Sequence, residues 1–285
     1  MSRELLTGLN RAYLVGKVRE ALEEDAADRD VTTTAVVAPD LWAEAELRAG
    51  AAGVAAGLAV SEAVFREVDA EAEFEALAAD GDRVTPGTVM ARVRGPLASL
   101  LSAERTALNF LQQLSGVATL TRRFVDAAGE RTVVLDTRKT APGLRPLQRH
   151  AVRAGGGVNH RFDLADAVLV KDNHVAAAGG TAEAIRLARC SGLPVQVEVE
   201  SLDELDVALE ERAECVLLDN MTPAEVGEAV RRTDRRAVLE VSGGVTLATI
   251  EGYAATGVDR ISIGALTHSA PALDVSMEVT CTWRR

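Results

Sequence analysis

Short hydrophobic runs alternate with helix-like segments throughout the second half of the chain. From residue 132 onward, six runs rich in β-branched residues recur at intervals suited to βα units: TVVLD, ADAVLVK, PVQVEVE, CVLLD, RAVLEVS and RISIG. Strands that alternate with helices predict a parallel sheet covered on both faces, and six in succession favour a barrel. The pattern predicts an α/β protein with a (β/α) barrel of the TIM-like type over residues 116–271. Between the runs, Ser201 with Glu204 predicts a capping box, and Pro223 is typical of a first helical turn.

The first part of the chain has a different pattern. The runs AEAELRA, AEFEALA and TVMARVRG predict strands, with a helix over residues 58–68 and a turn cluster, DGDRVTPG, at residues 80–87. We expect a separate N-terminal α+β sandwich domain over residues 1–115. A helical region over residues 97–128, broken near Gly116, joins the two domains, and the closing run DVSMEVTCTW predicts a strand within residues 272–285 that returns to the first domain.

Polar residues and glycines stand at the carboxyl end of each predicted barrel strand. In a (β/α) barrel this edge carries the catalytic groups, because the interior is packed and the βα loops are free to vary. We therefore predict an active site at this edge. The six strand-end residues are Asp136, Lys171, Glu200, Asp219, Ser242 and Gly264.

Composition narrows the classes of partner. With 285 residues, 47% of them hydrophobic, the chain can bury a substantial core, and its net charge of -12 opposes general binding to nucleic acid or to a membrane surface. The first 25 residues carry charges every few positions, which predicts a helix rather than a signal peptide and a cytoplasmic protein. The three cysteines form no CxxC pair, so we expect buried reduced thiols at Cys190, Cys215 and Cys281.

One window, residues 136–174, is basic within this acidic chain. It holds two of the three lysines, Lys139 and Lys171, and three of the four histidines. Taken alone, a pair such as Arg138 and Lys139 is more typical of a solvated loop than of a site. At a strand end, however, Arg138, His160, Arg161 and Lys171 are expected to converge on one pocket, where like charges need anions to stabilise them. The window predicts a ligand with at least two carboxylates or phosphates.

The later strand ends predict further polar contacts. Glu200 and Asp219 end neighbouring strands, where they are either helix caps or ligands for Mg²⁺ or ribose hydroxyls. Ser242, Gly243 and Gly244, like Gly264, precede predicted helices, which is typical either of packing turns or of a phosphate site built from backbone N–H groups. We favour a monophosphate there, with His268 nearby.

Together these motifs resemble the carboxylating nicotinate-nucleotide pyrophosphorylases, also called quinolinate phosphoribosyltransferases. The resemblance covers most of the chain and rests on DTRKTAPGLR, GGGVNHRFDLADAVLVKDNH, VEVE, LLDN, EVSGG, SIGALTHS and ERTALNFLQQLSG. It implies an N-terminal α/β domain, an open barrel and a homodimer. It also implies conversion of quinolinate and phosphoribosyl pyrophosphate (PRPP) to nicotinate mononucleotide, CO₂ and pyrophosphate.

The resemblance implies a role for each residue of the pattern. Arg138, His160, Arg161 and Lys171 would hold the two quinolinate carboxylates, and Arg105 would enter the partner subunit's site. Lys139 would contact the PRPP phosphates, while Glu200 and Asp219 would bind Mg²⁺ or ribose hydroxyls. The 5′-phosphate would bind at the remaining residues, which are Ser242, Gly243, Gly244, Gly264 and His268.

Three other functions stay open at this point. A paralogue of the same fold in molybdate metabolism would not need every quinolinate-binding cation. A Schiff-base aldolase would use Lys171 as its nucleophile. A phosphate-sensing dimer would bind ligand without turnover.

Overall fold

Strands from distant parts of the chain pair in one antiparallel sheet. In the computed structural model, which describes residues 10–285, β1 (Leu41–Ala49) pairs with β12 (Val275–Arg284) on one side and β5 (Val89–Pro96) on the other. β3 (Glu73–Ala76) completes the order β12-β1-β5-β3, and β2 (Gly53–Val54) pairs separately with β4 (Arg83–Val84). These strands belong to the first of two structural units, unit 1, which consists of residues up to Leu120, Gly143–Gly156 and Ala270–Arg285.

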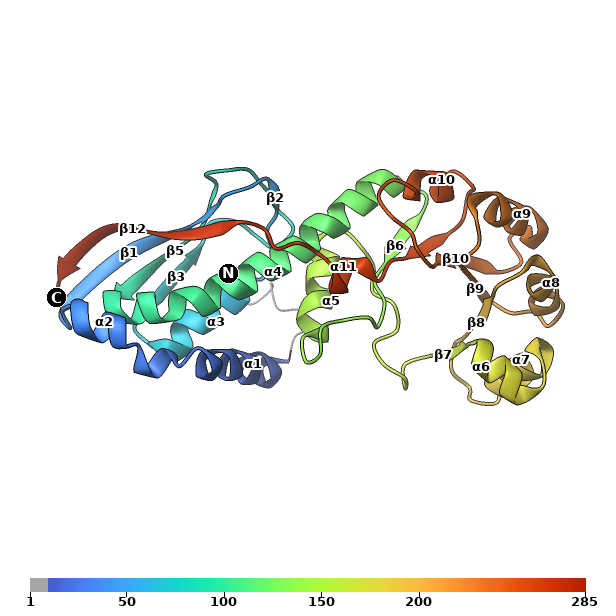
Figure 1. Cartoon of the computed structure of the whole chain (residues 1–285), viewed down its shortest axis with the longest axis horizontal. Coiled ribbons are helices and arrows are strands. Elements are labelled where there is room, and N and C mark those ends of the chain that lie inside the picture. The colour runs from blue at the N-terminus through green and yellow to red at the C-terminus, as the bar shows by residue number, and fades with distance from the viewer. Residues whose placement is uncertain (1–9) are drawn as a thin grey trace. The chain divides into compact units, whose positions relative to one another are not determined.

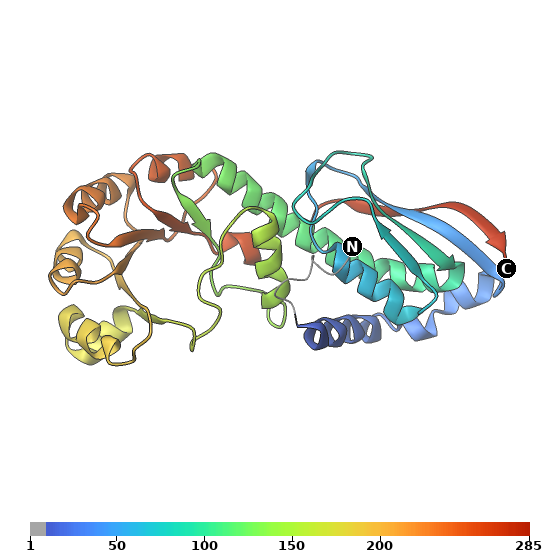
Figure 2. The ribbon, with the colours of Figure 1, turned by 180° about the vertical axis from the view of Figure 1, so that it is seen from behind.

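Helices cover the sheet of unit 1. Figures 1 and 2 both show α3 and α4 beside it. On α4, Leu100, Leu111 and Leu114 are fully buried, because apolar residues three or four apart share one helix face. The helices of this unit are α1 (Arg11–Glu24), a 3-10 turn (Ala27–Arg29), α2 (Val31–Val36), α3 (Leu58–Val68), α4 (Leu97–Ala128, assigned to this unit as far as Leu120) and α5 (Arg145–Ala154).

The predicted break near Gly116 is wrong, because α4 is one continuous helix of 32 residues. Gly116 has another use: a Cβ there would lie 2.1 Å from the carbonyl oxygen of Pro271 and 2.9 Å from Cα of Ala272. The glycine thus lets the segment that leads to β12 pass directly against the helix. A glycine within a helical pattern looks the same in the sequence whether it breaks the helix or makes room for another segment.

Unit 2 (Thr121–Pro142 and Gly157–Ser269) contains a six-stranded parallel sheet. Its strand order is β6-β11-β10-β9-β8-β7, and in the described chain β6 and β7 stay unpaired with each other, so the barrel is open. An isolated parallel bridge joins Leu135 to Val158 beyond β6. The strands are β6 (Val133–Leu135), β7 (Val168–Val170), β8 (Val195–Val199), β9 (Cys215–Asp219), β10 (Val238–Ser242) and β11 (Arg260–Ser262).

Helices lie outside these strands, as both views in Figures 1 and 2 show. Alternation along each strand decides which side chains face them: Val197 and Val199 of β8 are fully buried, while Gln196 and Glu198 point the other way, into the barrel. The predicted class, an open α/β barrel with a separate antiparallel sheet, is confirmed. The helices are α6 (Asp172–Ala178), α7 (Thr181–Arg189), α8 (Leu202–Glu210), α9 (Pro223–Thr233), α10 (Ile250–Ala254) and α11 (Ala265–His268).

Several local predictions have clear outcomes. The predicted burial of the cysteines is wrong, since Cys190 and Cys281 are exposed and Cys215 is only partly buried. Burial, and then the nearby Glu240, raise the pKa of the Cys215 thiol to about 11. The described helices include none with the length and hydropathy needed to cross a membrane. The cytoplasmic location stays a prediction, and the part of the expected N-terminal helix before residue 10 lies outside the described residues.

Candidate functional site

The carboxyl ends of the barrel strands surround a cavity of about 610 Å³ in unit 2. Glu200 and Arg105 do not line it. The predicted residues that do line it are Arg138, Lys139, His160, Arg161, Lys171, Asp219, Ser242, Gly243, Gly244, Gly264 and His268.

A buried carboxylate organises the basic side of the cavity. Asp136, which follows β6 directly and has no exposed surface, accepts hydrogen bonds from Nδ2 of Asn159 and from the backbone N–H of His160, both at 2.7 Å. The bridge between Leu135 and Val158 brings this segment alongside β6. Asp136 therefore fixes the backbone that carries His160 and Arg161.

Both ring nitrogens of His160 have partners within unit 2. The backbone N–H of Arg161 donates to Nδ1 at 2.8 Å, which puts the proton of the neutral ring on Nε2. Nε2 faces Oε1 of Glu240 at 3.3 Å, and Nε2 of Gln196 donates to the other oxygen of Glu240 at 3.0 Å. Glu240 is 1% exposed; its burial would raise its pKa, but the bonds from His160 and Gln196 outweigh this and lower the pKa.

Two guanidinium groups lie close together at the cavity. Nη1 of Arg161 donates to the carbonyl of Ala167 at 2.8 Å, which fixes the direction of its side chain. Burial, followed by the positive charge of Arg138, lowers the pKa of Arg161. Two cations that raise each other's energy are stabilised by an anion between them. The pair thus favours a negatively charged ligand.

Lys171 forms an ion pair with a residue that the sequence analysis did not identify. Its Nζ lies 2.6 Å from Oε2 of Glu198, whose side chain is 9% exposed at the cavity wall. The backbone N–H of Lys171 donates to Nδ1 of His174 at 2.9 Å, so His174 fixes the start of α6. His150 belongs to unit 1, where its Nε2 lies 2.6 Å from Oδ2 of Asp80. Of the three histidines in the basic window, only His160 lines the cavity.

The two predicted acidic residues differ in position. Asp219 ends β9 and lines the cavity, and its Oδ2 accepts a hydrogen bond from Nδ2 of Asn220 at 2.7 Å. Glu200 follows β8 and is exposed outside the cavity lining. The expected capping box is incomplete: Ser201 accepts from the N–H of Glu204 at 3.2 Å, but the carboxylate of Glu204 accepts from the N–H of Glu200 instead, at 2.8 Å.

The two glycine segments form different structures. Gly264 immediately precedes the short helix α11, as predicted. Ser242, Gly243 and Gly244 do not open a helix, and that prediction is wrong, because α10 begins only at Ile250. Gly243 and Gly244 have φ of 98° and 61°, so they form a turn that few other residues adopt readily.

Hydrogen bonds hold the backbone of Lys139 next to α11. Oγ1 of Thr267 donates to its carbonyl at 2.8 Å, and its N–H donates to Oγ1 of Thr137 at 3.1 Å. A Cβ on Gly264 would lie 3.0 Å from Cδ of Lys139 and 3.2 Å from Nε2 of His268. Gly264 therefore leaves room for both basic side chains next to the strand end.

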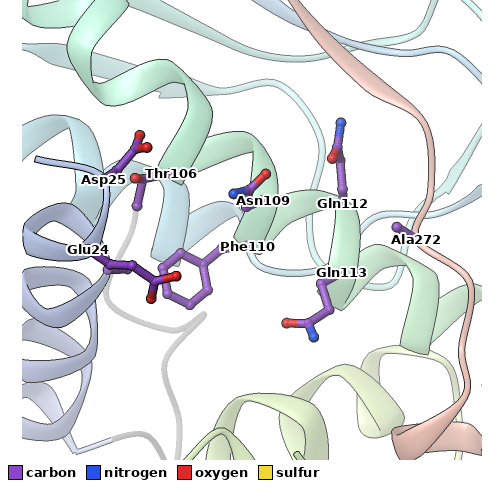
Figure 3. A pocket seen from close by; sticks show the side chains of 9 residues that line it. Glu24, Asp25, Thr106, Asn109, Phe110, Gln112, Gln113 and Ala272 are labelled. Atoms are coloured by element: carbon purple, nitrogen blue, oxygen red, sulfur yellow. The ribbon is translucent and has the colours of Figure 1, made fainter. Parts of the chain in front are cut away.

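Arg105 lies in unit 1, exposed on α4. One turn further along the helix is a second cavity of about 470 Å³, and Figure 3 shows it lined by amide side chains of α4, by Phe110 and by the acidic end of α1. The residues that the figure labels are Glu24, Asp25, Thr106, Asn109, Phe110, Gln112, Gln113 and Ala272.

Three polar residues near the barrel cavity were missed from the sequence. Glu198 and Glu240 lie inside strands written as hydrophobic runs, but each stands two residues before a predicted strand-end residue, Glu200 or Ser242, and so shares its face. That alternation was the available signal. Asn220 offered none beyond its place after Asp219.

Comparisons with known proteins agree with this geometry. Residues 117–278 match the family model "Quinolinate phosphoribosyl transferase, C-terminal domain", and residues 30–115 match "Quinolinate phosphoribosyl transferase, N-terminal domain". The two matches together cover more than half of the chain.

Individual relatives are similar over nearly the whole chain. The nicotinate-nucleotide pyrophosphorylase [carboxylating] of Mycobacterium leprae is 44% identical in an alignment of 271 positions that covers 92% of this chain and 95% of the relative. Quinolinate phosphoribosyltransferase [decarboxylating] 1b of Nicotiana tabacum is 41% identical, over 93% of this chain and 82% of the relative. The crystal structure of NadC from Streptococcus pyogenes is 41% identical, with a TM-score of 0.92 over 97% of this chain and 99% of that one.

Proposed function

We propose that this chain, which belongs to the quinolinate phosphoribosyltransferase family, transfers the phosphoribosyl group of PRPP to quinolinate. The products are nicotinate mononucleotide, CO₂ and pyrophosphate, a step of de novo NAD biosynthesis. One observation carries the proposal: a single cavity is lined both by clustered cations and by a carboxylate with a glycine turn. A dicarboxylate and a phosphorylated ribose need these two kinds of surface side by side.

Quinolinate is proposed to bind at Arg138, Arg161 and Lys171. The lowered pKa of Arg161, caused first by burial and then by the positive charge of Arg138, supports this assignment, because a carboxylate beside Arg161 would stabilise its charged form. His160 is proposed to hold Arg161 in place, since its Nδ1 accepts from the N–H of Arg161 and its Nε2 faces Glu240. Leu169 and Leu217 add apolar surface to the same cavity for the pyridine ring.

PRPP is proposed to bind on the opposite side. Lys139 and His268, which lie next to Gly264, would contact its phosphates, together with the N–H groups of the turn at Ser242, Gly243 and Gly244. Asp219, which lines the cavity, would accept hydrogen bonds from the ribose hydroxyls. Glu200, exposed beyond the cavity lining, would act at its rim.

Mg²⁺ is proposed as the cofactor, held by Asp219 and Glu200 directly or through water. Among residues 10–285 no group of three or more His, Cys, Asp or Glu side chains is arranged to hold a metal. Mg²⁺ needs no such group, because it keeps several of its waters and shares carboxylates with substrate phosphates. When bound there, the ion would neutralise charge on the departing pyrophosphate.

The chain's own residues then act by positioning and electrostatics. The three cations would orient quinolinate so that its ring nitrogen faces the anomeric carbon of PRPP. The nitrogen forms the new bond as the bond to pyrophosphate breaks, and Lys139 stabilises the leaving group. When the adjacent carboxylate leaves as CO₂, the quaternised ring nitrogen stabilises the carbanion that remains on the ring carbon. That carbon then takes a proton from water, so no further organic cofactor is needed.

A homodimer is proposed, with Arg105 of each chain acting at the partner's cavity. Arg105 is exposed on α4, and the polar cavity beside it (Figure 3) gives this face of the helix a surface that a second copy would cover. The homodimer itself is an expectation from the family resemblance.

Turnover is the direct test. We expect quinolinate-dependent conversion of PRPP to nicotinate mononucleotide, with release of CO₂ that requires Mg²⁺. The absence of product with both substrates at saturating concentration would overturn the proposal. Borohydride trapping of a carbonyl substrate on Lys171 would instead support an aldolase. The ion pair with Glu198 argues against that, because a lysine paired with a carboxylate is a poor nucleophile.

A further inference from the structure

We propose that Asn220 is a positioning residue that links the Asp219 carboxylate to the glycine turn after β10 and so sets the KM for PRPP. The inference rests on the proposed function, because that function assigns both Asp219 and the glycine turn to PRPP. Asn220 stands in the motif LLDN, but the resemblance assigns it no role.

The backbone of Asn220 extends the pairing of β9 with β10 by one residue. Asp219 is in register with Ser242, and the N–H of Asn220 donates to the carbonyl of Ser242 at 2.9 Å. At this point the chain adopts a left-handed conformation, with φ of 56°. Asparagine is one of the few residues other than glycine that tolerate this conformation well.

The side chain of Asn220 touches two elements of the site. Its Nδ2 donates to Oδ2 of Asp219 at 2.7 Å. Its Oδ1 lies against Gly243, where a Cβ would be 2.2 Å from Oδ1 and 2.9 Å from the backbone N of Asn220. The amide therefore fills the space that any side chain at position 243 would need, while it holds one oxygen of the Asp219 carboxylate.

This arrangement explains why asparagine suits position 220 better than glycine or aspartate. Asp219 and Gly243 both line the cavity, and the proposed function gives them the ribose and the 5′-phosphate of the same molecule. A glycine at 220 would keep the turn but lose the amide. An aspartate would keep the shape but put a second carboxylate against Asp219, and the two charges would repel each other. Only an amide both donates to Asp219 and packs neutrally against Gly243.

The contacts of Asn220 also predict which substrate is affected. Its side chain donates to Asp219 and lies against Gly243, whereas Arg138, Arg161 and Lys171 stand in the segments next to β6 and β7. Loss of the amide should therefore weaken PRPP binding and leave quinolinate binding unchanged. A general loss of structure would affect both substrates.

The experiment compares the wild type with Asn220→Gly and Asn220→Asp in steady-state kinetics, varying each substrate separately. We expect the KM for PRPP to rise about three- to tenfold in Asn220→Gly, the range for loss of one ordinary hydrogen bond, because the bond to Asp219 is exposed to solvent. In Asn220→Asp the rise should be larger. The KM for quinolinate should stay within about twofold of the wild-type value in both variants, with unchanged circular dichroism.

Asp234→Gly is the matched control, because Asp234 is also left-handed, with φ of 44°, but caps α9 away from the cavity lining. It should change neither KM. An unchanged KM for PRPP in Asn220→Gly, or an equal rise in both KM values, would overturn the inference. If Asn220→Gly fails to fold, the ratio of the two KM values in Asn220→Asp decides in the same way. A wild-type protein without turnover would contradict the proposed function instead.

Discussion

The ammonium group of Lys171 lies 2.6 Å from a carboxylate oxygen of Glu198, and the two residues come from neighbouring parallel strands. Glu198 is 9% exposed and Lys171 46% exposed, so the carboxylate is the more buried partner. A buried charge that loses its partner is strongly unfavourable, and one that faces an anion site also repels the ligand. Loss of Lys171 is therefore expected to do more than remove one contact with a substrate, because it also leaves the Glu198 carboxylate without its ion-pair partner.

We expect Lys171→Met to raise the KM for quinolinate by about tenfold, less than truncation of a fully buried charge pair would, because Lys171 is half exposed. Adding Glu198→Gln to this variant should recover several-fold of the loss, because the unpaired carboxylate is then removed. Steady-state kinetics of both variants measure the difference. A double variant as impaired as Lys171→Met alone would show that Glu198 exerts no such repulsion.

The buried Glu240 predicts sensitivity to acid. Its pKa is lowered despite its burial, because His160 and Gln196 stabilise the charged form. A carboxyl group whose pKa is lowered on folding stabilises the protein above its unfolded pKa, and the contribution is lost as the pH falls through the folded pKa. The free energy of unfolding should therefore decrease below about pH 4.5, the usual value for glutamate.

Glu240→Gln should lower the unfolding free energy at pH 7 by about 1–3 kcal/mol and flatten its decrease in acid. Urea unfolding followed by circular dichroism at several pH values measures both effects. Glu183→Gln, which alters a carboxylate with 51% side-chain exposure on α7, serves as the control and should leave the profile unchanged. A profile for Glu240→Gln that is parallel to that of the wild type would contradict the prediction.

Gly264→Ala should impair PRPP binding without unfolding the barrel. The new Cβ would lie 3.0 Å from Cδ of Lys139 and 3.2 Å from Nε2 of His268, so both side chains must shift. We expect the KM for PRPP to rise about three- to tenfold, because a displaced phosphate contact weakens a charge-assisted hydrogen bond. Gly227→Ala on α9 is the matched control, since its Cβ would meet only Thr256, at 4.0 Å. It should stabilise the helix slightly and leave the kinetics unchanged.

The strands of the barrel were predictable because burial favours short runs rich in β-branched residues, even where polar residues alternate with them as in β8 and β10, and the strand ends followed directly. Gly116 shows the limit of this kind of argument. A glycine in a helix indicates equally a break and a close approach of another segment, and only the position of Pro271 distinguishes the two.

Site residues were predictable where the chain order alone brings them together. Asp219 and Ser242 end adjacent strands, so their proximity follows from the topology. Glu198 and Asn220 depend on side-chain directions: Glu198 on the alternation along β8, and Asn220 on one left-handed residue. Glu200 illustrates the converse, since a correct strand end does not ensure that the side chain lines the cavity.

The proposed exchange of Arg105 between subunits predicts complementation. Arg105→Ala and Arg138→Ala should each lose most activity, because each removes a cation that is proposed to bind a carboxylate of quinolinate. If Arg105 acts at the partner's cavity, a mixed dimer has one site with both substitutions and one site with neither. Equal mixing with free exchange makes about half of the dimers mixed, so activity should return to about a quarter of the wild-type level.

The measurement is turnover after the two variants are mixed, with subunit exchange followed independently by a mass or fluorescent label. If Arg105 acted within its own chain, both sites of a mixed dimer would carry one substitution each, and mixing would restore nothing. Exchange without recovery would therefore exclude the shared site while leaving a dimer intact. Recovery requires that α4 of one chain completes the anion pocket of another, because no other combination gives a site with both arginines.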